Sequence, residues 1–462
     1  MVAPQLAAYV QGQGAVSADN LNSFEQTCDN FTQLRGLIGL PGMQVFTRGG
    51  TTIADGKQGP FYWSQGIYID DGVNVIVPIG ASSGAWIRLQ LVASVQPSGA
   101  PLLSGKNRLI NGDLRLNQYA GQSQLTPNAT GYVADRWFTS LSQSAKLIFQ
   151  TSQNSNSAPS IYCENIENSG SAYTPLANDV FTFAQAVEAN NVNDIQFGSG
   201  GAKALTLSFW ASAVVPGTYA GAIQNYAATR SYVFTYSLPI SNTWTYIVIT
   251  LPGDAGGTWQ LAGNAGSLKV IFDLGSGTNF STTPGIWVSG SYLIAPGTVK
   301  VVSNIPAVLS LTDIQLELAP PGATPSNPIA SQYDRRLIAT EFANCQRYFE
   351  TSFPYGTTPG DGISGLVTML GTAYTANIIE YATRFTVPKR AAPTMTGYRG
   401  SNAGSVGSGL WNYYNAGWLA GAAPSAFQSD TTGFSRTNNT SAAVTANGSN
   451  LLDGNWTASA EL

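Results

Sequence analysis

Residues 205–213, LTLSFWASA, show most directly how this chain folds. Apolar residues occupy every second position from Leu205 to Ala211, and the positions between and after them hold Thr206, Ser208, Trp210 and Ser212. A period of two residues is typical of a β-strand that buries one face. The stretches LKVIFDL (268–274) and DIQLEL (313–318) repeat the pattern. Many such runs, separated by turns rich in Gly, Pro, Asn and Ser, predict a two-sheet sandwich of jelly-roll type over residues 107–330.

The overall composition predicts the same fold class. Charged residues make up 10% of the 462 residues, against about 25% in an average soluble domain. Small polar residues and 50 glycines take their place, and aromatic residues reach 11%, which is enough to build hydrophobic cores. Because these residue types favour strands joined by many turns, we expect an all-β, multidomain protein.

Length and local composition divide the chain into several parts. The stretch ASVQPSGAPLLSGK (93–106) is small and polar and contains two prolines, as linkers often do. The expected parts are an N-terminal module of a small helix and β-structure (1–95), a linker (96–106), the sandwich (107–330), a short helix (331–350) and a separate C-terminal β domain (351–462).

Two segments carry helical spacing. In residues 17–39 the apolar stripe consists of Leu21, Phe24, Cys28 and Phe31. It predicts a helix that packs on its own domain or, alternatively, forms a short self-associating bundle. In residues 331–350 the stripe consists of Ile338, Phe342, Cys345 and Phe349. It predicts a helix that packs on a neighbouring sheet or lies between subunits.

The absence of histidine limits the possible chemistry. It excludes Ser-His-Asp and Cys-His nucleophilic sites and HExxH zinc sites. The widely spaced Cys28, Cys163 and Cys345 predict buried thiols without a disulfide framework or a zinc site. A catalytic pair of carboxylates remains possible, but no residue is assigned to one. We expect no enzymatic activity, no cofactor and no metal, and we interpret Asp135, Arg136 and Trp137 as a structural Arg–Asp pair beside a buried tryptophan.

Charge and hydropathy limit the possible partners. The net charge of −4 includes no basic stripe, which argues against binding to nucleic acid. No stretch approaches the roughly 18 consecutive apolar residues of a membrane-spanning helix. The first residues, MVAPQLAAYVQGQGAVSADN, lack the pattern of a secretory signal. We therefore expect a protein that is made in the cytoplasm, does not insert into a membrane, and leaves the cell by another route such as lysis.

Several motifs near the N-terminus resemble a module of bacteriophage and prophage tail fibres and tailspikes. They are LNSFEQTCDNFTQLRGLIGLPGM (21–43), VFTRGGTTIADGKQGPFYW (45–63), DDGVNVIVP (70–78) and GAWIRL (84–89). The resemblance implies that residues 1–95 attach the protein to other tail or baseplate proteins of a virion.

Further motifs resemble a recurrent tail-fibre domain, and they occur in that family's usual order. They are NRLINGDLRLNQ (107–118), GYVADRWF (131–138), LTLSFWASA, LTDIQLELAPPGATP (311–325) and YDRRLIATEFANCQRYFE (333–350), with the ending GNWTASAEL (454–462). The resemblance implies a sandwich similar to carbohydrate-binding modules, a homotrimer, and a location on the virion.

A glycan-binding protein needs aromatic faces and planar polar side chains. Residues 409–418, GLWNYYNAGW, combine both. If this stretch is a loop, its candidate contacts to a host cell-surface glycan are Trp411, Asn412, Tyr413, Tyr414, Asn415 and Trp418. The alternative is that these aromatic residues fill the core of a small domain. Trp244 and Trp259 of the sandwich are weaker candidates.

Three functions remain open on the sequence. The first is a receptor-binding tail fibre, and the second is a tailspike that depolymerises polysaccharide through a carboxylate pair. The third is a structural fibre of the capsid or tail tip without a receptor role. No repeating β-helix rungs separate the N-terminal module from the C-terminal domain, which argues against the depolymerase. The low charge and the order of the motifs favour the tail fibre.

Overall fold

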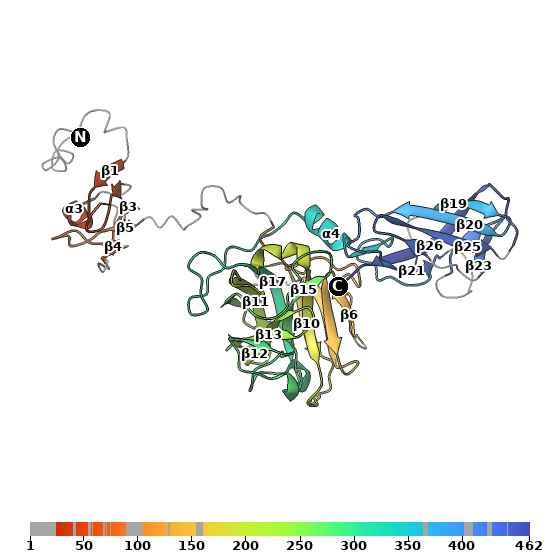
Figure 1. Ribbon diagram of the computed structural model, residues 1–462, viewed down its shortest axis with the longest axis horizontal. Helices are drawn as coiled ribbons and strands as arrows, with labels where there is room; N and C mark the ends of the chain where they lie inside the picture. The colour runs from red at the N-terminus through yellow and green to blue at the C-terminus, as the bar shows by residue number, and fades with distance from the viewer. Residues whose placement is uncertain are drawn as a thin grey trace. The chain divides into compact units, whose positions relative to one another are not determined.

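The computed structural model contains two compact units, residues 1–103 and 104–462 (Figure 1). The structure describes residues 25–39, 43–53, 57, 59–67, 70, 72–73, 75–88, 105–127, 130–153, 160–363, 368–401, 410–422, 427–440 and 442–462. Strands are the main regular elements among them, which confirms the all-β, multidomain prediction. In these ranges no helix is long and apolar enough to cross a bilayer. The same ranges contain no group of three or more Cys, Asp or Glu residues that could hold a metal ion.

The first unit contains a five-stranded sheet and one short helix. In sheet order the strands are β1 (Glu25–Cys28), β2 (Gln44–Thr47), β3 (Gly59–Ser64), β5 (Ala85–Arg88) and β4 (Val75–Ile76), and the helix α3 is Phe31–Arg35. β1 and β2 are parallel, and the other pairs are antiparallel. Trp63 and Trp86 pack edge to face in the core, with ring centroids 5.3 Å apart.

The prediction of a helix over residues 17–39 is wrong in its extent. Residues 25–28 form the strand β1 instead, because they pair with β2 along their whole length. The helix begins after Asn30, whose side chain accepts a hydrogen bond from the Gln33 amide. Cys28 and Phe31 are both buried in the same core, so a strand and a helix together produced the apparent helical spacing. The other two residues of the stripe lie outside the described residues.

The sandwich consists of two antiparallel sheets. The first has seven strands, in the order β16 (Trp287–Ser289), β13 (Arg230–Leu238), β12 (Gly217–Asn225), β15 (Gly266–Asp273), β10 (Phe181–Glu188), β7 (Trp137–Leu141) and β6 (Gly131–Ala134). The second has five, in the order β14 (Thr245–Leu251), β11 (Leu205–Ala213), β17 (Val308–Leu318), β9 (Tyr162–Asn168) and β8 (Leu147–Gln153). Some consecutive strands lie in the same sheet, as β6 with β7 and β8 with β9 do, and others cross to the opposite sheet, as from β9 to β10 and from β10 to β11. Short 3₁₀ helices lie at Ala189–Asn191, Asn193–Ile195, Thr278–Phe280 and Val301–Ser303.

The apolar residues of β11 lie in the core between these sheets. Leu205, Leu207, Phe209 and Ala211 are fully buried, as their spacing predicted. The ring of Phe209 meets Phe272 of the seven-stranded sheet edge to face at 5.0 Å. Burial of about 150–250 Å² per aromatic side chain makes such contacts a major stabilising contribution.

The C-terminal strands form a further sheet, and part of it closes on itself. The strands are β18 (Phe349–Thr351), β19 (Thr368–Thr375), β20 (Ile378–Arg384), β21 (Thr394–Arg399), β22 (Asn412–Tyr414), β23 (Trp418–Ala422), β24 (Gln428–Ser429), β25 (Gly433–Thr440) and β26 (Ser449–Ser459). The order β26-β19-β20-β25-β23-β22 returns to β26, because β22 also pairs with β26. Closure leaves no open edge in this ring of strands. Trp411, Phe434 and Trp456 fill its core.

The helix expected over residues 331–350 is shorter than predicted. The helix α4 spans Ile338–Gln346, and Phe349 already belongs to the strand β18. Residues 331–334 remain irregular because their backbone binds the side chains of β17. The Ser331 amide donates to Glu317 at 2.8 Å, and the Asp334 amide donates to Gln315 at 2.8 Å. Local hydrogen bonds to a neighbouring strand therefore replace the first turns of the helix.

The Arg–Asp pair expected at residues 135–136 is not formed. Arg136 is buried and forms its ion pair with Glu461, while its guanidinium lies 3.6 Å from the centre of the Tyr348 ring. Asp135 accepts hydrogen bonds from Gln118. Arg136 therefore links the sandwich to the C-terminal residues, whereas Asp135 holds Gln118, whose side-chain amide also donates to the Phe349 carbonyl. The three cysteines are buried and form no disulfide, as predicted.

Candidate functional site

Half of the predicted glycan contacts in residues 409–418 are inside the protein. Trp411 and Tyr413 are fully buried in the C-terminal core, and Asn412 between them is also fully buried. The indole nitrogen of Trp411 donates to the Asn455 carbonyl at 3.0 Å, so even its polar atom is satisfied internally. These three residues therefore fill the core, which is the alternative that the sequence left open.

Tyr414, Asn415 and Trp418 lie at the hairpin between β22 and β23. Tyr414 is 45% exposed, and its ring meets the ring of Trp418 at 5.6 Å and 75°. Asn415 is exposed, but its side chain donates to the Ala443 carbonyl at 2.9 Å. The hairpin thus offers one aromatic pair and little free hydrogen-bonding capacity.

A second surface lies on the outer face of the five-stranded sheet. The strand period of two turns Trp210 of β11 and Tyr246 of β14 away from the core, directly opposite each other. Their rings lie 5.1 Å apart at 39°. Tyr246 is 42% exposed and Trp210 is half-buried. Two aromatic faces are therefore held side by side on the surface of the sheet.

Hydroxyl and amide groups continue this side of the sheet, although Thr206, Ser208 and Thr312 are buried and only the remaining groups are partly exposed. We define the polar sheet face as Ser152, Asn165, Thr206, Ser208, Trp210, Tyr246, Ser310 and Thr312. Within it, the Asn165 amide donates to Ser152 at 2.6 Å, and Ser310 donates to the Asn165 carbonyl oxygen at 2.6 Å. Thr206 and Thr250 share a hydrogen bond of 2.9 Å. These bonds hold the polar groups in fixed positions beside the aromatic pair.

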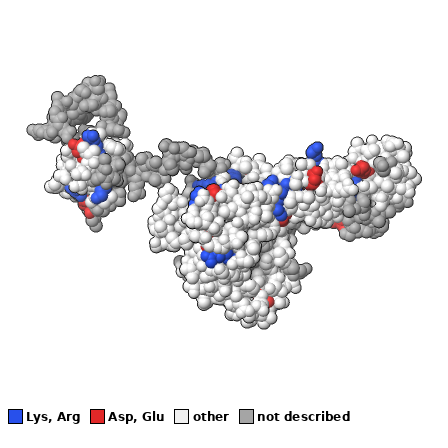
Figure 2. All heavy atoms as spheres, in the orientation of Figure 1, with Lys and Arg blue, Asp and Glu red and all other residues white. Residues whose placement is uncertain are grey.

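An ion cluster adjoins the polar sheet face. Asp313 follows Thr312 on β17, and the Arg335 guanidinium donates to it at 2.9 Å and to Asp113 at 3.0 Å. Burial raises the pKa of both carboxyls, whereas the charge of Arg335 opposes that rise. The eight residues of the polar sheet face are uncharged, but two carboxylates lie on the same side of the sheet: Glu317 is the cross-strand partner of Thr206, and Glu167 lies two residues beyond Asn165. Figure 2 shows that charged side chains are sparse on the visible surface.

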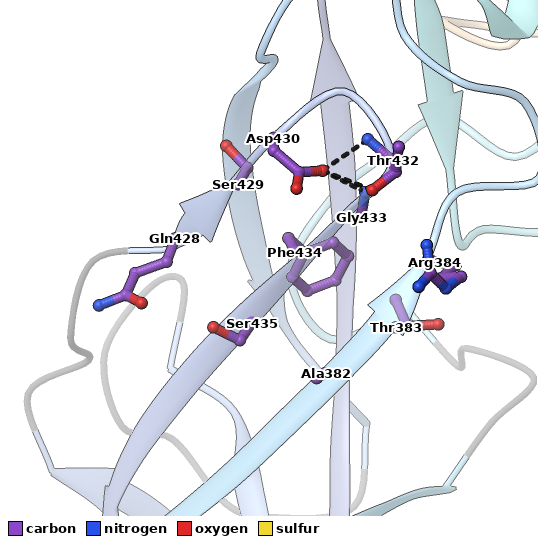
Figure 3. Close-up of a pocket in the computed structure, with 10 residues that line it drawn as sticks. All are labelled: Ala382, Thr383, Arg384, Gln428, Ser429, Asp430, Thr432, Gly433, Phe434 and Ser435. Carbon is purple, nitrogen blue, oxygen red and sulfur yellow. Dashed lines mark hydrogen bonds between the residues drawn. The ribbon is translucent and has the colours of Figure 1, made fainter.

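The hollow in Figure 3 lies at a turn between two strands and does not combine an exposed aromatic pair with hydroxyl and amide groups. Its residues belong to the ends of β20, β24 and β25, and Asp430 lies at the tip. One oxygen of Asp430 accepts from the amides of Thr432 and Gly433 and from the Thr432 hydroxyl. These bonds lower the pKa of Asp430 and occupy one of its two carboxylate oxygens.

The sequence contained a signal for the polar sheet face. Trp210 is the aromatic residue on the polar side of the alternating stretch 205–213, where solubility alone would favour a small polar residue. Of the two weaker candidates, Trp259 packs edge to face on Phe197 at 4.9 Å and is structural. Trp244 is half-buried just before β14.

Comparisons with known proteins place these observations in context. No protein-family model matches the chain, and no curated sequence is similar to it. The enzymatically active domain of bacteriophage CBA120 tailspike protein 4 is 11% identical, with a TM-score of 0.24. The match covers 47% of this chain and 22% of that chain, so this protein spans about a fifth of the tailspike structure.

Two carbohydrate-binding modules also match. TmCBM61, solved with β-1,4-galactotriose, is 13% identical over 46% of this chain and 98% of that chain, with a TM-score of 0.25. The family 11 module of a Clostridium thermocellum cellulase is 14% identical over 43% and 96%, with a TM-score of 0.22. At TM-scores this low, the similarities decide neither the function nor its residues.

Proposed function

We propose that this protein is a non-enzymatic attachment protein of a bacteriophage-like particle, a tail fibre that binds a host cell-surface glycan through the polar sheet face. The observation that carries the proposal is the Trp210–Tyr246 pair beside fixed hydroxyl and amide groups. Aromatic rings pack on the C–H faces of sugars, and hydroxyl and amide groups bind sugar hydroxyls.

The role on a virion has separate support. The N-terminal motifs resemble the attachment module of tail fibres, and residues 1–103 form a compact unit of their own. An attachment protein needs one part that binds the particle and another that binds the host. The arrangement of two units meets that requirement.

Binding of purified full-length protein to host polysaccharide tests the glycan part of the proposal. Tyr246→Ala should weaken binding about tenfold or more, because it removes one of the two stacking faces. Tyr226→Ala is a matched control, since Tyr226 is also 42% exposed but lies outside the polar sheet face. Equal binding by wild type and the Tyr246 variant would contradict the assigned site.

Gold-labelled antibody against residues 107–330 on intact particles tests the virion part. Labelling at the tail fibres supports the proposal. Particles that carry the label at the capsid or tail tip, and that adsorb normally when the antibody is bound, would indicate a structural fibre without a receptor role.

One observation favours polysaccharide depolymerisation as a second candidate. Asp113 and Asp313 meet at Arg335, and burial raises the pKa of both carboxyls. Glycoside hydrolysis uses two carboxylates at a short separation. Incubation with host capsule or lipopolysaccharide, with assay of released reducing ends, distinguishes the two functions. Release at catalytic rates that Asp313→Asn abolishes would replace the non-enzymatic proposal.

A further inference from the structure

A cavity of about 720 Å³ lies where α4 meets the sandwich. Its wall includes Ile338 and Phe342 of α4, Thr151 of β8, Tyr162 of β9, and Tyr355, which follows β18. The volume falls within the roughly 300–1,000 Å³ typical of small-molecule sites. The cavity is separate from the polar sheet face, because Thr151 and Tyr162 alternate with the residues of that face along β8 and β9.

Two aromatic rings form one corner of this cavity. Phe342 and Tyr355 meet at 5.9 Å and 82°, so each presents its edge or face to the same space. The Tyr355 hydroxyl donates to the Arg115 carbonyl at 3.0 Å and accepts from the Asn117 amide at 3.3 Å. These bonds fix the ring in place although Tyr355 is 55% exposed. A fixed, exposed aromatic corner lowers the entropic cost of binding a ligand.

The cavity has no unpaired charge among its described lining residues. Arg115 is the charged residue of the wall, and its guanidinium lies 3.2 Å from the Asp113 carboxylate. It also donates a hydrogen bond to the Arg336 carbonyl. Since Asp113 is 1% exposed, this pair is already largely removed from water. An acidic ligand would find no free cation here, so the site favours a neutral ligand.

Most of the hydrogen-bonding side chains that line the cavity belong to the sandwich. The Thr151 hydroxyl donates to Glu164 at 2.8 Å and accepts from the Asn117 amide at 3.1 Å. The Gln122 side-chain amide forms no hydrogen bond within the part of the chain that the structure describes, and it faces solvent. The side chains that α4 contributes, those of Ile338, Ala339 and Phe342, are apolar. Burying a sugar hydroxyl there without a partner would cost about 1–3 kcal/mol.

We propose that this cavity is a second carbohydrate site, which takes a neutral sugar that bears a methyl group, either an N-acetyl or a 6-deoxy sugar. The methyl group lies against the apolar side formed by α4, and the ring hydroxyls lie toward Gln122 and Thr151. The inference rests on the proposed glycan-binding function and names a sugar class for a site apart from the polar sheet face.

Saturation-transfer NMR on the full-length protein tests the inference, with N-acetylglucosamine, rhamnose and glucose as probes. We expect transfer to the methyl protons of at least one of the first two sugars and little transfer to glucose. Phe342→Ala should weaken that binding about tenfold. Ala339→Trp should abolish it by filling the cavity, and because Ala339 is exposed on α4 the variant should keep the wild-type melting temperature.

Leu370→Ala is the control, since Leu370 is 66% exposed and lies outside this cavity. The absence of methyl transfer in wild type, or equal transfer in the Ala339→Trp variant, would overturn the inference. Polysaccharide binding that depends on Tyr246 would then still stand by itself. If wild type shows methyl transfer but does not bind polysaccharide, the assignment of the polar sheet face as a glycan site would be wrong, and the cavity would stand as the sugar site.

Discussion

The C-terminal stretch 409–418 and the strand β11 both contain tryptophan, but they use it in opposite ways. Trp411 is fully buried in a closed ring of strands. Trp210 lies on the outer face of a sheet, opposite Tyr246. The first stretch has the higher local density of aromatic residues, but it buries Trp411 and Tyr413 and leaves only the Tyr414–Trp418 pair at the hairpin, whereas the second places its tryptophan in an aromatic pair on the outer face of a sheet. Strand register and sheet closure, not aromatic density, decide which ring can touch a ligand.

Replacement of Trp411 is the most damaging change that this comparison predicts. Trp411→Ala should lower the free energy of unfolding by about 3–5 kcal/mol, because it leaves a large cavity in the C-terminal core. Urea unfolding followed by circular dichroism measures the loss. Trp210→Ala is the partner experiment and should cost far less. Equal losses for the two variants would show that Trp210 is also a core residue.

A buried carboxyl inside the sandwich, that of Glu164, should make the stability of the protein depend on pH. Burial raises the pKa of Glu164 to about 8, and Thr151 opposes the rise. Because this value lies above that of an unfolded glutamate, the stabilising contribution is complete below pH ~4.3 and is lost as the pH rises through 8. We expect the free energy of unfolding to fall by about 1.4 kcal/mol per pH unit between these values.

The Glu164→Gln variant tests the origin of that slope. The amide keeps an oxygen that can accept from Thr151 and removes the titrating proton. The variant should therefore show a flatter stability profile between pH 5 and pH 8 in urea unfolding. A profile that matches wild type would assign the pH dependence to other carboxyls.

The aromatic pair on the polar sheet face should act as a unit in binding. A double-mutant cycle with Trp210→Ala and Tyr246→Ala should give a coupling energy of about 0.5–1.5 kcal/mol in affinity for host polysaccharide. Calorimetric titration of the four proteins provides the values. Strictly additive losses would mean that the two rings contact separate parts of the glycan or that only one of them does.

The hairpin tip should give the smallest effect. Tyr414→Ala removes a half-exposed ring and should change the free energy of unfolding by about 0.5 kcal/mol or less. Polysaccharide binding and particle adsorption should stay at wild-type levels. A clear loss of adsorption by a folded variant would show that residues 414–418 contact the receptor, contrary to the assignment of the polar sheet face.

Alternation along single strands was readable from sequence, whereas the extents of the helices were not. The buried face from Leu205 to Ala211 follows from its period of two. The stripe that ends at Phe31 was misread, because a strand paired with β2 and a short helix placed their residues in one core. Similarly, the side chains of Gln315 and Glu317 bind the backbone that was expected to begin the second helix.

By itself, the sequence determined the all-β class, the buried faces of the strands and the absence of histidine chemistry, because composition and a period of two act locally. Tertiary structure alone decided which aromatic residues are exposed. The pairing of β11 with β14 set Trp210 against Tyr246 on the surface, and the return of β22 to β26 enclosed Trp411. Both outcomes depend on contacts between residues distant in the chain, which no local pattern records.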